Sequence, residues 1–567
     1  MSHRSTGDVL ASLRPPPHQV FGTMGKLLER RAFAGRMPAV PGGLRPRGIM
    51  GHQLVNAQPP TRPGGAAVSI PTVAGRHYIA GQWLAASGDT FPSRSPANKN
   101  FVVGTFPSGT PNIANDAVAA AKAAFPTWRR TSRILRAECF DRLARLIDRD
   151  TDALATLMAN ECGKTRAECR AEVIEGLHMV QYVFGTGRMP IGTIVESEIA
   201  EKDAFVRRKP KGVVAVITPW NFPFAVPLWM LGPSLLEGNT AVFKPSEDTP
   251  AAGQRIVELF VEAGFPAGTI NLVHGEGPVG EALVRNPDVA AVLFTGSYEV
   301  GRRIQQLSAD FWDRTVAAEM GSKSAVVVCE DCKIDLAVSA AVISAFKTSG
   351  QRCVSAGRIL VSERVFDDFA RKFVDRVRRL RVGDPLDPNS FTGPVINENA
   401  VEKVLKYNKL AVDEGATVLA AGDRLTGLDH REGYYVAPFV YRIGHGERVR
   451  CIREEVFGPH VALIPFRTNE DAVRIYNDTD YGLSLAVITE SFRTMRLFRE
   501  ECDFGMGYVN LPCIGAEVHL PFGGVKKSGN GHPSAAGLAD VVTHKVAWTV
   551  NHGTEIRMAQ GLSAEVG

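Results

Sequence analysis

The sequence contains no long uninterrupted apolar segment. Hydrophobic residues make up 44% and charged residues 22% of its 567 positions, yet no run reaches the roughly 18 apolar residues that a membrane-spanning helix requires. This composition is ordinary for a globular enzyme. We therefore expect a soluble protein without a membrane partner, long enough for about three or four domain-sized units, or two large units and an appendage.

Clustered cysteines are also missing. The nine cysteines are odd in number and spread along the chain, which argues against a disulfide framework and favours a reducing compartment, the cytoplasm. Cys329 and Cys332 have CxxC spacing, but no second CxxC or histidine pair stands at the spacing of a zinc site. We interpret them as incidental thiols at the end of a strand and expect no metal site.

Acidic residues are scarce in the first 75 positions. This segment has nine basic and two acidic residues, a net charge of +7, whereas the rest of the chain has a net charge of −2. The basic balance therefore gives no support for a nucleic-acid partner of the main body. Rich in Arg, Pro and Gly, residues 1–75 are predicted to be a disordered extension or an overlong translated start. The alternative is a transit peptide, which would place the protein in the mitochondrial matrix.

From Arg76 onward the pattern becomes that of a folded α/β protein. A strand-turn-strand pattern covers 77–83, and helical spacing follows at 113–128 and in one long stretch at 134–184. Buried-strand runs then alternate with helical segments, which indicates crossover units and a parallel sheet. The expected strands are 212–217, 240–243, 269–273 and 289–294. A second alternating block occupies 324–509.

Two further segments are expected to form strands at the surface. Residues 190–209 alternate and carry charge like an exposed hairpin, and 541–550 are apolar and β-branched like a terminal strand. We expect the hairpin to pair with another subunit.

The motif at 275–280 matches GxGxxG, but Pro278 removes one of the amides that would hold a pyrophosphate. We interpret this motif as a tight strand-to-helix turn.

Residues that can carry chemistry stand at the ends of these strands. Cys353 lies in a Gly-Gln-Arg-Cys turn, and a nucleophilic thiol there would need a lowered pKa from a nearby cation or helix N-terminus. The Asn221 amide can donate to a developing oxyanion. Lys244 and Glu247 offer a cation and a carboxylate for a nucleotide ribose. The turn at 294–297 offers free amides for a phosphate, and carboxylates stand at 319 and 454–455.

Together with the segment 521–529, these motifs resemble the aldehyde dehydrogenase superfamily over residues 76–552. The resemblance implies two doubly wound parallel-sheet domains, a Rossmann-like cofactor domain and a catalytic domain, with a small β oligomerisation element. The NAD-binding domain would comprise 76–189 and 211–321, and the catalytic domain 322–524. The oligomerisation hairpin and C-terminal strand would comprise 190–210 and 525–552, followed by a tail at 553–567. The assembly would be a homodimer or homotetramer.

The resemblance also implies residue roles. Cys353 would attack the aldehyde carbon, and the Asn221 amide and the Cys353 N–H would hold the oxyanion. Hydride transfer would leave a thioester, which water activated by Glu319 would hydrolyse. Lys244 belongs to both the catalytic and the cofactor-binding sets. The cofactor-binding residues would be Thr218, Pro219, Trp220, Lys244, Ser246, Glu247, Gly296, Ser297, Gly301, Met320, Gly321, Glu455 and Phe457.

The cofactor and substrate follow in part. Glu247 should accept a hydrogen bond from the adenosine 2′-hydroxyl and repel a 2′-phosphate, which favours NAD over NADP. The acid at Glu319 favours hydrolysis over transfer to coenzyme A. Ser322 stands where the family often has glycine, and its side chain could restrict the movement of Glu319.

The substrate is a small aldehyde of open identity. The loop 514–520 is similar to branches that act on amino-acid-derived semialdehydes, so such a dehydrogenase is the alternative, with a non-catalytic member of the fold less favoured. Glu517 and His519 suit a charged substrate or a solvated loop equally well. Arg352 and Cys513 are candidates for the same entrance.

Overall fold

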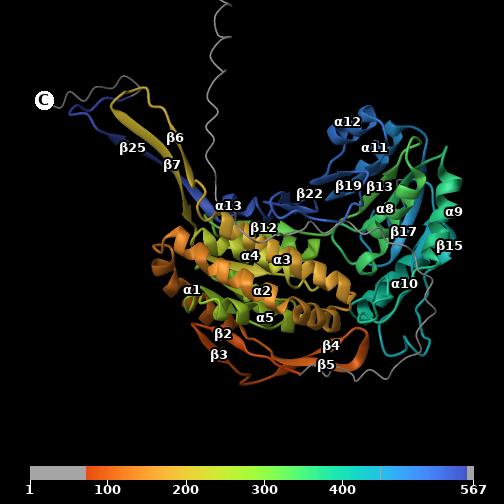
Figure 1. Ribbon diagram of the computed structural model, residues 1–567, viewed down its shortest axis with the longest axis horizontal. Coiled ribbons are helices and arrows are strands. Elements are labelled where there is room, and N and C mark those ends of the chain that lie inside the picture. Colours follow the sequence, from red (N-terminus) through yellow and green to blue (C-terminus); the bar gives the residue numbers. More distant parts are fainter. Residues whose placement is uncertain (1–71, 447–448, 559–567) are drawn as a thin grey trace, which may run out of the picture. The chain divides into compact units, whose positions relative to one another are not determined.

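The computed structural model describes residues 72–446 and 449–558 (Figure 1). The predictions for residues 1–71, and for the end of the tail beyond residue 558, lie outside the described residues. The α/β fold class is confirmed, because two large and mainly parallel sheets carry helices on their connections. Within these ranges no helix is both long enough and apolar enough to cross a lipid bilayer.

The first sheet has eight strands in the order β23-β12-β11-β8-β9-β10-β2-β3. Five of these strands, β12-β11-β8-β9-β10, are parallel to one another. Most of their residues are buried, which is why the strands appear as continuous apolar runs in the sequence. The four strands predicted in this region are confirmed within two residues. The bounds are β2 His77–Ile79, β3 Gln82–Leu84, β8 Val213–Ile217, β9 Thr240–Lys244, β10 Ile270–Leu272, β11 Val289–Thr295, β12 Thr315–Glu319 and β23 Gly529–Asn530.

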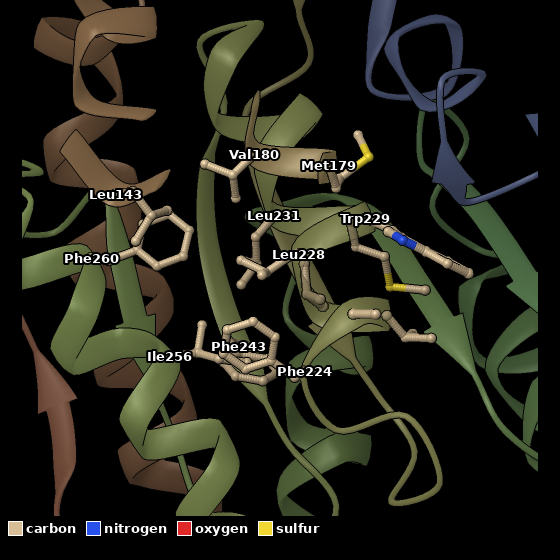
Figure 2. Close-up of a cluster of buried hydrophobic side chains, with 14 of the residues drawn as sticks. Leu143, Met179, Val180, Phe224, Leu228, Trp229, Leu231, Phe243, Ile256 and Phe260 are labelled. Carbon is tan, nitrogen blue, oxygen red and sulfur yellow. The ribbon is translucent and has the colours of Figure 1, made fainter. Parts of the chain in front are cut away.

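Helices cover this sheet and form its core. The bounds are α1 Pro111–Trp128, α2 Arg133–Cys162, α3 Arg166–Thr186, α4 Ala225–Leu236, α5 Pro250–Glu262, α6 Gly277–Arg285 and α7 Tyr298–Ser308. Figure 2 shows how Leu143, Val180, Leu228, Phe243 and Phe260 from several of these elements meet in one apolar cluster. Burial of such side chains stabilises the layer that positions the site.

The helical pattern predicted at 134–184 is confirmed, and the structure divides it into two helices. The stretch at 134–184 is not one helix, because Gly163 adopts a left-handed conformation with φ 76° and ends α2. The Thr165 side chain then accepts a hydrogen bond from Glu168 N and caps α3. The turn between the two helices places Lys164 in the interior, where it reaches the site described below.

The second sheet has seven strands in the order β15-β16-β17-β14-β13-β19-β20, with only the edge strand β15 antiparallel. The chain passes from the first sheet to the second between Glu319 and Ser324. The strands are β13 Ser324–Val328, β14 Ala356–Ser362, β15 Thr417–Ala421, β16 Phe439–Arg442, β17 His460–Phe466, β19 Ser484–Ile488 and β20 Met506–Val509. The helices are α8 Ile334–Phe346, α9 Phe366–Val377, α10 Glu398–Asp413, α11 Asn469–Asn477 and α12 Phe492–Glu501.

A third, separate sheet joins the hairpin to the end of the chain. β7 (Lys202–Pro210) lies between β6 (Gly192–Val195) and β25 (Thr543–Asn551), in the order β25-β7-β6 (Figure 1). The predicted hairpin and terminal strand are therefore confirmed, except that Leu538–Val541 forms the short helix α13. Smaller strands complete the fold: β1 Val73–Ala74, β4 Thr90–Ser95, β5 Asn98–Pro107, β18 Tyr481–Gly482, β21 Pro521–Phe522, β22 Val525–Lys526 and β24 Ser534–Ala535.

Candidate active site

Cys353 follows a strained turn at the end of α8. Thr348, Ser349 and Gly350 all have positive φ values, 55°, 52° and 69°, a conformation that costs non-glycine residues about 1 kcal/mol or more each. Buried hydrogen bonds hold the turn, from Thr348 N to the Glu168 carboxylate at 2.8 Å and from Ser349 N to Thr392 Oγ1 at 2.7 Å. The turn brings the thiol to the wall of a cavity of about 230 Å³.

Asn221 lies on the wall of the same cavity. Its Nδ2 donates to Gln351 O at 2.9 Å, and its own backbone carbonyl accepts from Lys164 Nζ at 2.8 Å. One amide N–H of Nδ2 thus anchors the cysteine turn, and the amide has a second N–H. The predicted proximity of Asn221 to Cys353, which are 132 positions apart in the sequence, is confirmed.

The surroundings of Cys353 do not supply the lowered pKa that a nucleophilic thiol needs. Burial, together with the nearby carboxylates of Glu319 and Glu455, raises the pKa of the thiol to about 12. The neighbouring cation of Arg352 has a smaller effect, because its guanidinium is paired with Glu168 at 3.3 Å. The thiol is therefore protonated at neutral pH and needs a base to become a nucleophile.

Glu319 is the last residue of β12 and is buried. A Cβ atom added to Gly523 would lie 2.6 Å from its Oε1, and one added to Gly529 would lie 3.2 Å from both oxygens. The carboxylate therefore occupies a recess that only glycine leaves free. Burial raises its pKa well above the usual value, which the backbone of Gly524 only partly counters. Glu319 does not line the thiol cavity in this conformation, so its side chain must rotate to act there.

A second cavity of about 770 Å³ lies at the carboxyl ends of β8, β9 and β11. It shares Pro219, Trp220 and the turn 295–297 with the thiol cavity, so the two cavities adjoin and are together called the cleft. Eight of the predicted cofactor residues line it: Thr218, Pro219, Trp220, Lys244, Ser246, Glu247, Gly296 and Ser297. Four others line the thiol cavity: Met320, Gly321, Glu455 and Phe457.

Gly301 is the predicted cofactor residue that lines neither cavity. A Cβ atom there would lie 2.4 Å from Met320 Sδ, so this glycine serves the packing of α7 against Met320. The GxGxxG turn is a tight turn as predicted, with Gly275 at φ 137°. However, Gly277, Pro278 and Gly280 of α6 line the second cavity, a role that the sequence interpretation missed.

The second cavity contains polar groups suited to a dinucleotide, some of which have no hydrogen-bond partner in the part of the chain that the structure describes. The hydroxyls of Thr218 and Thr295 are buried without a hydrogen-bond partner among the described residues. Lys244 Nζ lies 3.4 Å from Glu247 Oε2, and burial lowers the pKa of this lysine. The N-terminus of α7 supplies backbone amides to the same cleft. Hydroxyl, ammonium and carboxylate groups of this kind are suited to ribose and phosphate oxygens.

Other predicted positions have different environments. Cys513 is fully buried and bonded to Val354 O, so the prediction that it lines the entrance is wrong. Glu517 and His519 pair with each other at 3.1 Å and are mainly exposed, which agrees with a solvated loop. Arg352 lines the thiol cavity as expected. Ser322 Oγ bonds to Cys353 O and lies 2.9 Å from Ser324 Oγ.

Sequence interpretation missed an acidic face on α3. Glu168, Glu172 and Glu175 are spaced by four and three residues, so they lie on one face of the helix. Glu168 contacts the cysteine turn, and Glu172 Oε1 accepts from the backbone N–H groups of Phe224 and Ala225. Three acids at helical spacing, on a helix whose other buried residues are mainly apolar, were the available signal.

Comparisons with known proteins agree with this geometry. The model of a family described as the aldehyde dehydrogenase family matches residues 83–546. The chain is 36% identical over 456 residues to the α-ketoglutaric semialdehyde dehydrogenase of Bacillus subtilis, covering 80% of this chain and 93% of that protein. It is 36% identical over 498 residues to the 1-pyrroline-5-carboxylate dehydrogenase of Geobacillus kaustophilus, covering 86% and 95%.

Solved structures show the same relationship. The betaine aldehyde dehydrogenase of Staphylococcus aureus in complex with NAD+ superposes with a TM-score of 0.82 and 31% identity, covering 86% of this chain and 97% of that one. The structure of PnpE with nicotinamide adenine dinucleotide also superposes with a TM-score of 0.82, at 33% identity, covering 85% and 99%.

Proposed function

This chain belongs to the aldehyde dehydrogenase family, and from that premise we propose that it oxidises an aldehyde to the carboxylic acid with NAD, through a thioester on Cys353. The observation that carries the assignment is the cleft, in which a thiol cavity lined by Cys353 and Asn221 adjoins a cavity suited to a dinucleotide. The NAD-bound relatives support the choice of cofactor.

Acylation begins with removal of the thiol proton, because burial holds the pKa of Cys353 at about 12. The thiolate attacks the aldehyde carbon, and negative charge develops on the former carbonyl oxygen. The Nδ2 amide of Asn221 and the backbone N–H of Cys353 donate to that oxygen. Asn221 is held for this role by its bonds to Gln351 O and to Lys164.

Glu319 serves as the base. In its ionised form a carboxylate with a raised pKa is a stronger base than an ordinary carboxylate. It takes the proton of the thiol, passes that proton to solvent, and then takes a proton from the water that hydrolyses the thioester. Rotation from the recess beside Gly523 and Gly529 brings it to the thiol cavity. Ser322 holds the Cys353 carbonyl during both steps.

NAD, when bound, supplies the hydride acceptor. Lys244, Glu247 and Ser246 would hold its adenosine side, and Glu247 would accept a hydrogen bond from the 2′-hydroxyl, which disfavours NADP. The turn at 296–297 and Thr218 would bind the phosphates. Glu455, Phe457, Met320 and Gly321 would hold the nicotinamide side. In this proposal 76–189 and 211–321 form the cofactor domain and 322–524 the catalytic domain.

The assembly is a homodimer or homotetramer in the cytoplasm, with the mitochondrial matrix as the alternative. The sheet of β6, β7 and β25 supports self-association, because Ile194 is 90% exposed and Trp548 50% exposed. The semialdehyde alternative is supported by the names of the Bacillus and Geobacillus relatives. A non-catalytic role is disfavoured, because Asn221, Glu319 and Cys353 are all present.

The test is NADH formation, followed by absorbance, with a panel of aliphatic aldehydes and semialdehydes. Cys353→Ala should abolish turnover on every substrate, since no thioester forms without the thiol. Cys332→Ala is the matched control, because Cys332 lines neither cavity, and it should retain full activity. A wild-type protein that binds NAD but oxidises no aldehyde in the panel would contradict the proposal.

A further inference from the structure

The thiol cavity contains one carboxylate that the mechanism above does not use. Glu175 of α3 lines this cavity together with Arg352 and Phe222. Its Oε1 is shut off from solvent and has no hydrogen-bond partner among the described residues. A buried acceptor without a partner destabilises the free protein, so its presence beside the nucleophile points to a ligand.

The neighbouring ion pairs explain why Glu175, among the three glutamates on this face of α3, has no cationic partner. Lys164 pairs with Glu172, and both side chains are almost fully buried. Arg352 pairs with Glu168 at 3.3 Å, and its Nε donates to Thr348 Oγ1 at 2.9 Å. Lys164 and Arg352 therefore each have a carboxylate already, whereas Glu175 has no ion pair within the described ranges.

We infer that Glu175 is a specificity-determining residue, which receives the ammonium group of an amino-substituted aldehyde whose carbonyl lies at Cys353. This inference rests on the proposed function. An ammonium donates to the unpartnered carboxylate and balances its charge, and such charge-assisted bonds are stronger than neutral ones. A neutral aliphatic aldehyde would leave the carboxylate unpaired. The aromatic ring of Phe222 lines the same wall, and Arg352 and Lys164 lie over it at 5.1 Å and 4.2 Å.

The inference has a pH signature. Burial and the nearby Glu172 raise the pKa of Glu175, Arg352 and Lys164 oppose the rise, and the resulting pKa is about 8. Glu175 is thus mostly protonated at pH 6.5 and mostly ionised at pH 8.5. Since the ammonium binds the ionised form, its affinity should rise by about 25-fold between these pH values for a pKa of about 8. The charged and titratable groups around Glu175 are Lys164, Glu168, Glu172, Arg352, Cys353 and Tyr508.

The experiment compares 3-aminopropanal with butanal, which carries a methyl group in place of the ammonium, and with succinic semialdehyde, which carries a carboxylate. Wild type should prefer 3-aminopropanal over butanal in kcat/KM by about 10- to 100-fold. Glu175→Gln should reduce that ratio to near unity, because the isosteric amide has no charge. Glu517→Gln is the matched control, since Glu517 is exposed and lines neither cavity, and it should keep the wild-type ratio.

A second measurement does not depend on turnover. Calorimetric binding of 3-aminopropan-1-ol should tighten from pH 6.5 to 8.5 in wild type and stay flat in Glu175→Gln, whereas butan-1-ol should show no such change. If aldehydes are oxidised but butanal or succinic semialdehyde is preferred, or the preference survives in Glu175→Gln, the inference is wrong and the proposed function stands. If no aldehyde is oxidised but the amino alcohol binds through Glu175, the proposed function fails and the ammonium site stands.

Discussion

Replacing Lys164 by methionine tests how the interior charges hold the site. Lys164 Nζ bonds to the Glu172 carboxylate and to Asn221 O at 2.8 Å, and the two paired side chains are only 2% and 1% exposed. Glu172 in turn accepts from Phe224 N at 2.9 Å and Ala225 N at 3.1 Å, at the start of α4. The pair therefore connects the turn after α2 to the segment that carries Asn221.

The expected loss follows from the burial. Removing one partner leaves an uncompensated buried charge at Glu172, which costs about 3–5 kcal/mol in free energy of unfolding. Lys122→Met is the matched control, because Lys122 pairs with Asp288 at 2.6 Å but the side chains are 62% and 39% exposed. Such a surface pair contributes about 0–1 kcal/mol. Adding Glu172→Gln to Lys164→Met removes the unpaired buried charge and should recover part of the lost free energy of unfolding.

Urea unfolding followed by tryptophan fluorescence measures these differences, and steady-state kinetics on the same proteins measure the effect on the site. Because Asn221 loses its anchor, we expect kcat of Lys164→Met to fall by about 10²-fold, the scale of a lost oxyanion donor. The reasoning is refuted if Lys164→Met is no less stable than Lys122→Met, or if the double variant is less stable than Lys164→Met alone.

Two further changes address the reaction itself. Glu319→Gln should slow both the first turnover of NADH and the steady state by about 10²- to 10⁴-fold, because the thiol and the water that hydrolyses the thioester both lose their base. Rapid mixing measures both phases, and unchanged rates would contradict the role of Glu319. Ser322→Ala should lower kcat several-fold with little change in KM, because the Cys353 carbonyl loses its hydrogen bond; Ser339→Ala on the exposed face of α8 is the control, and equal kcat values would show that the bond does not position the thiol.

The sequence allowed the sheets and much of the cleft to be predicted for a physical reason. Strands such as β8 and β9 are buried on both faces, so they appear as unbroken apolar runs. The carboxyl ends of parallel strands lie at one edge of the sheet. Asn221, which follows β8, and Lys244, which ends β9, could therefore be expected near a common cleft. Their grouping with Cys353 followed from the family resemblance.

What could not be predicted depends on contacts between distant segments. The break at Gly163 depends on one left-handed residue within a helical pattern, and the raised pKa of Cys353 depends on burial and on Glu319 and Glu455.

The acidic face of α3 is another feature that depends on contacts between distant segments. Glu168, Glu172 and Glu175 are chemically identical and lie on one helix face, yet their neighbours give them different states. Arg352 neutralises the first and Lys164 the second, so both serve to hold the backbone near Cys353 and Asn221. The third has no such cation and faces the substrate cavity. Its availability for a ligand is therefore a property of the fold, created by the pairing of the other two.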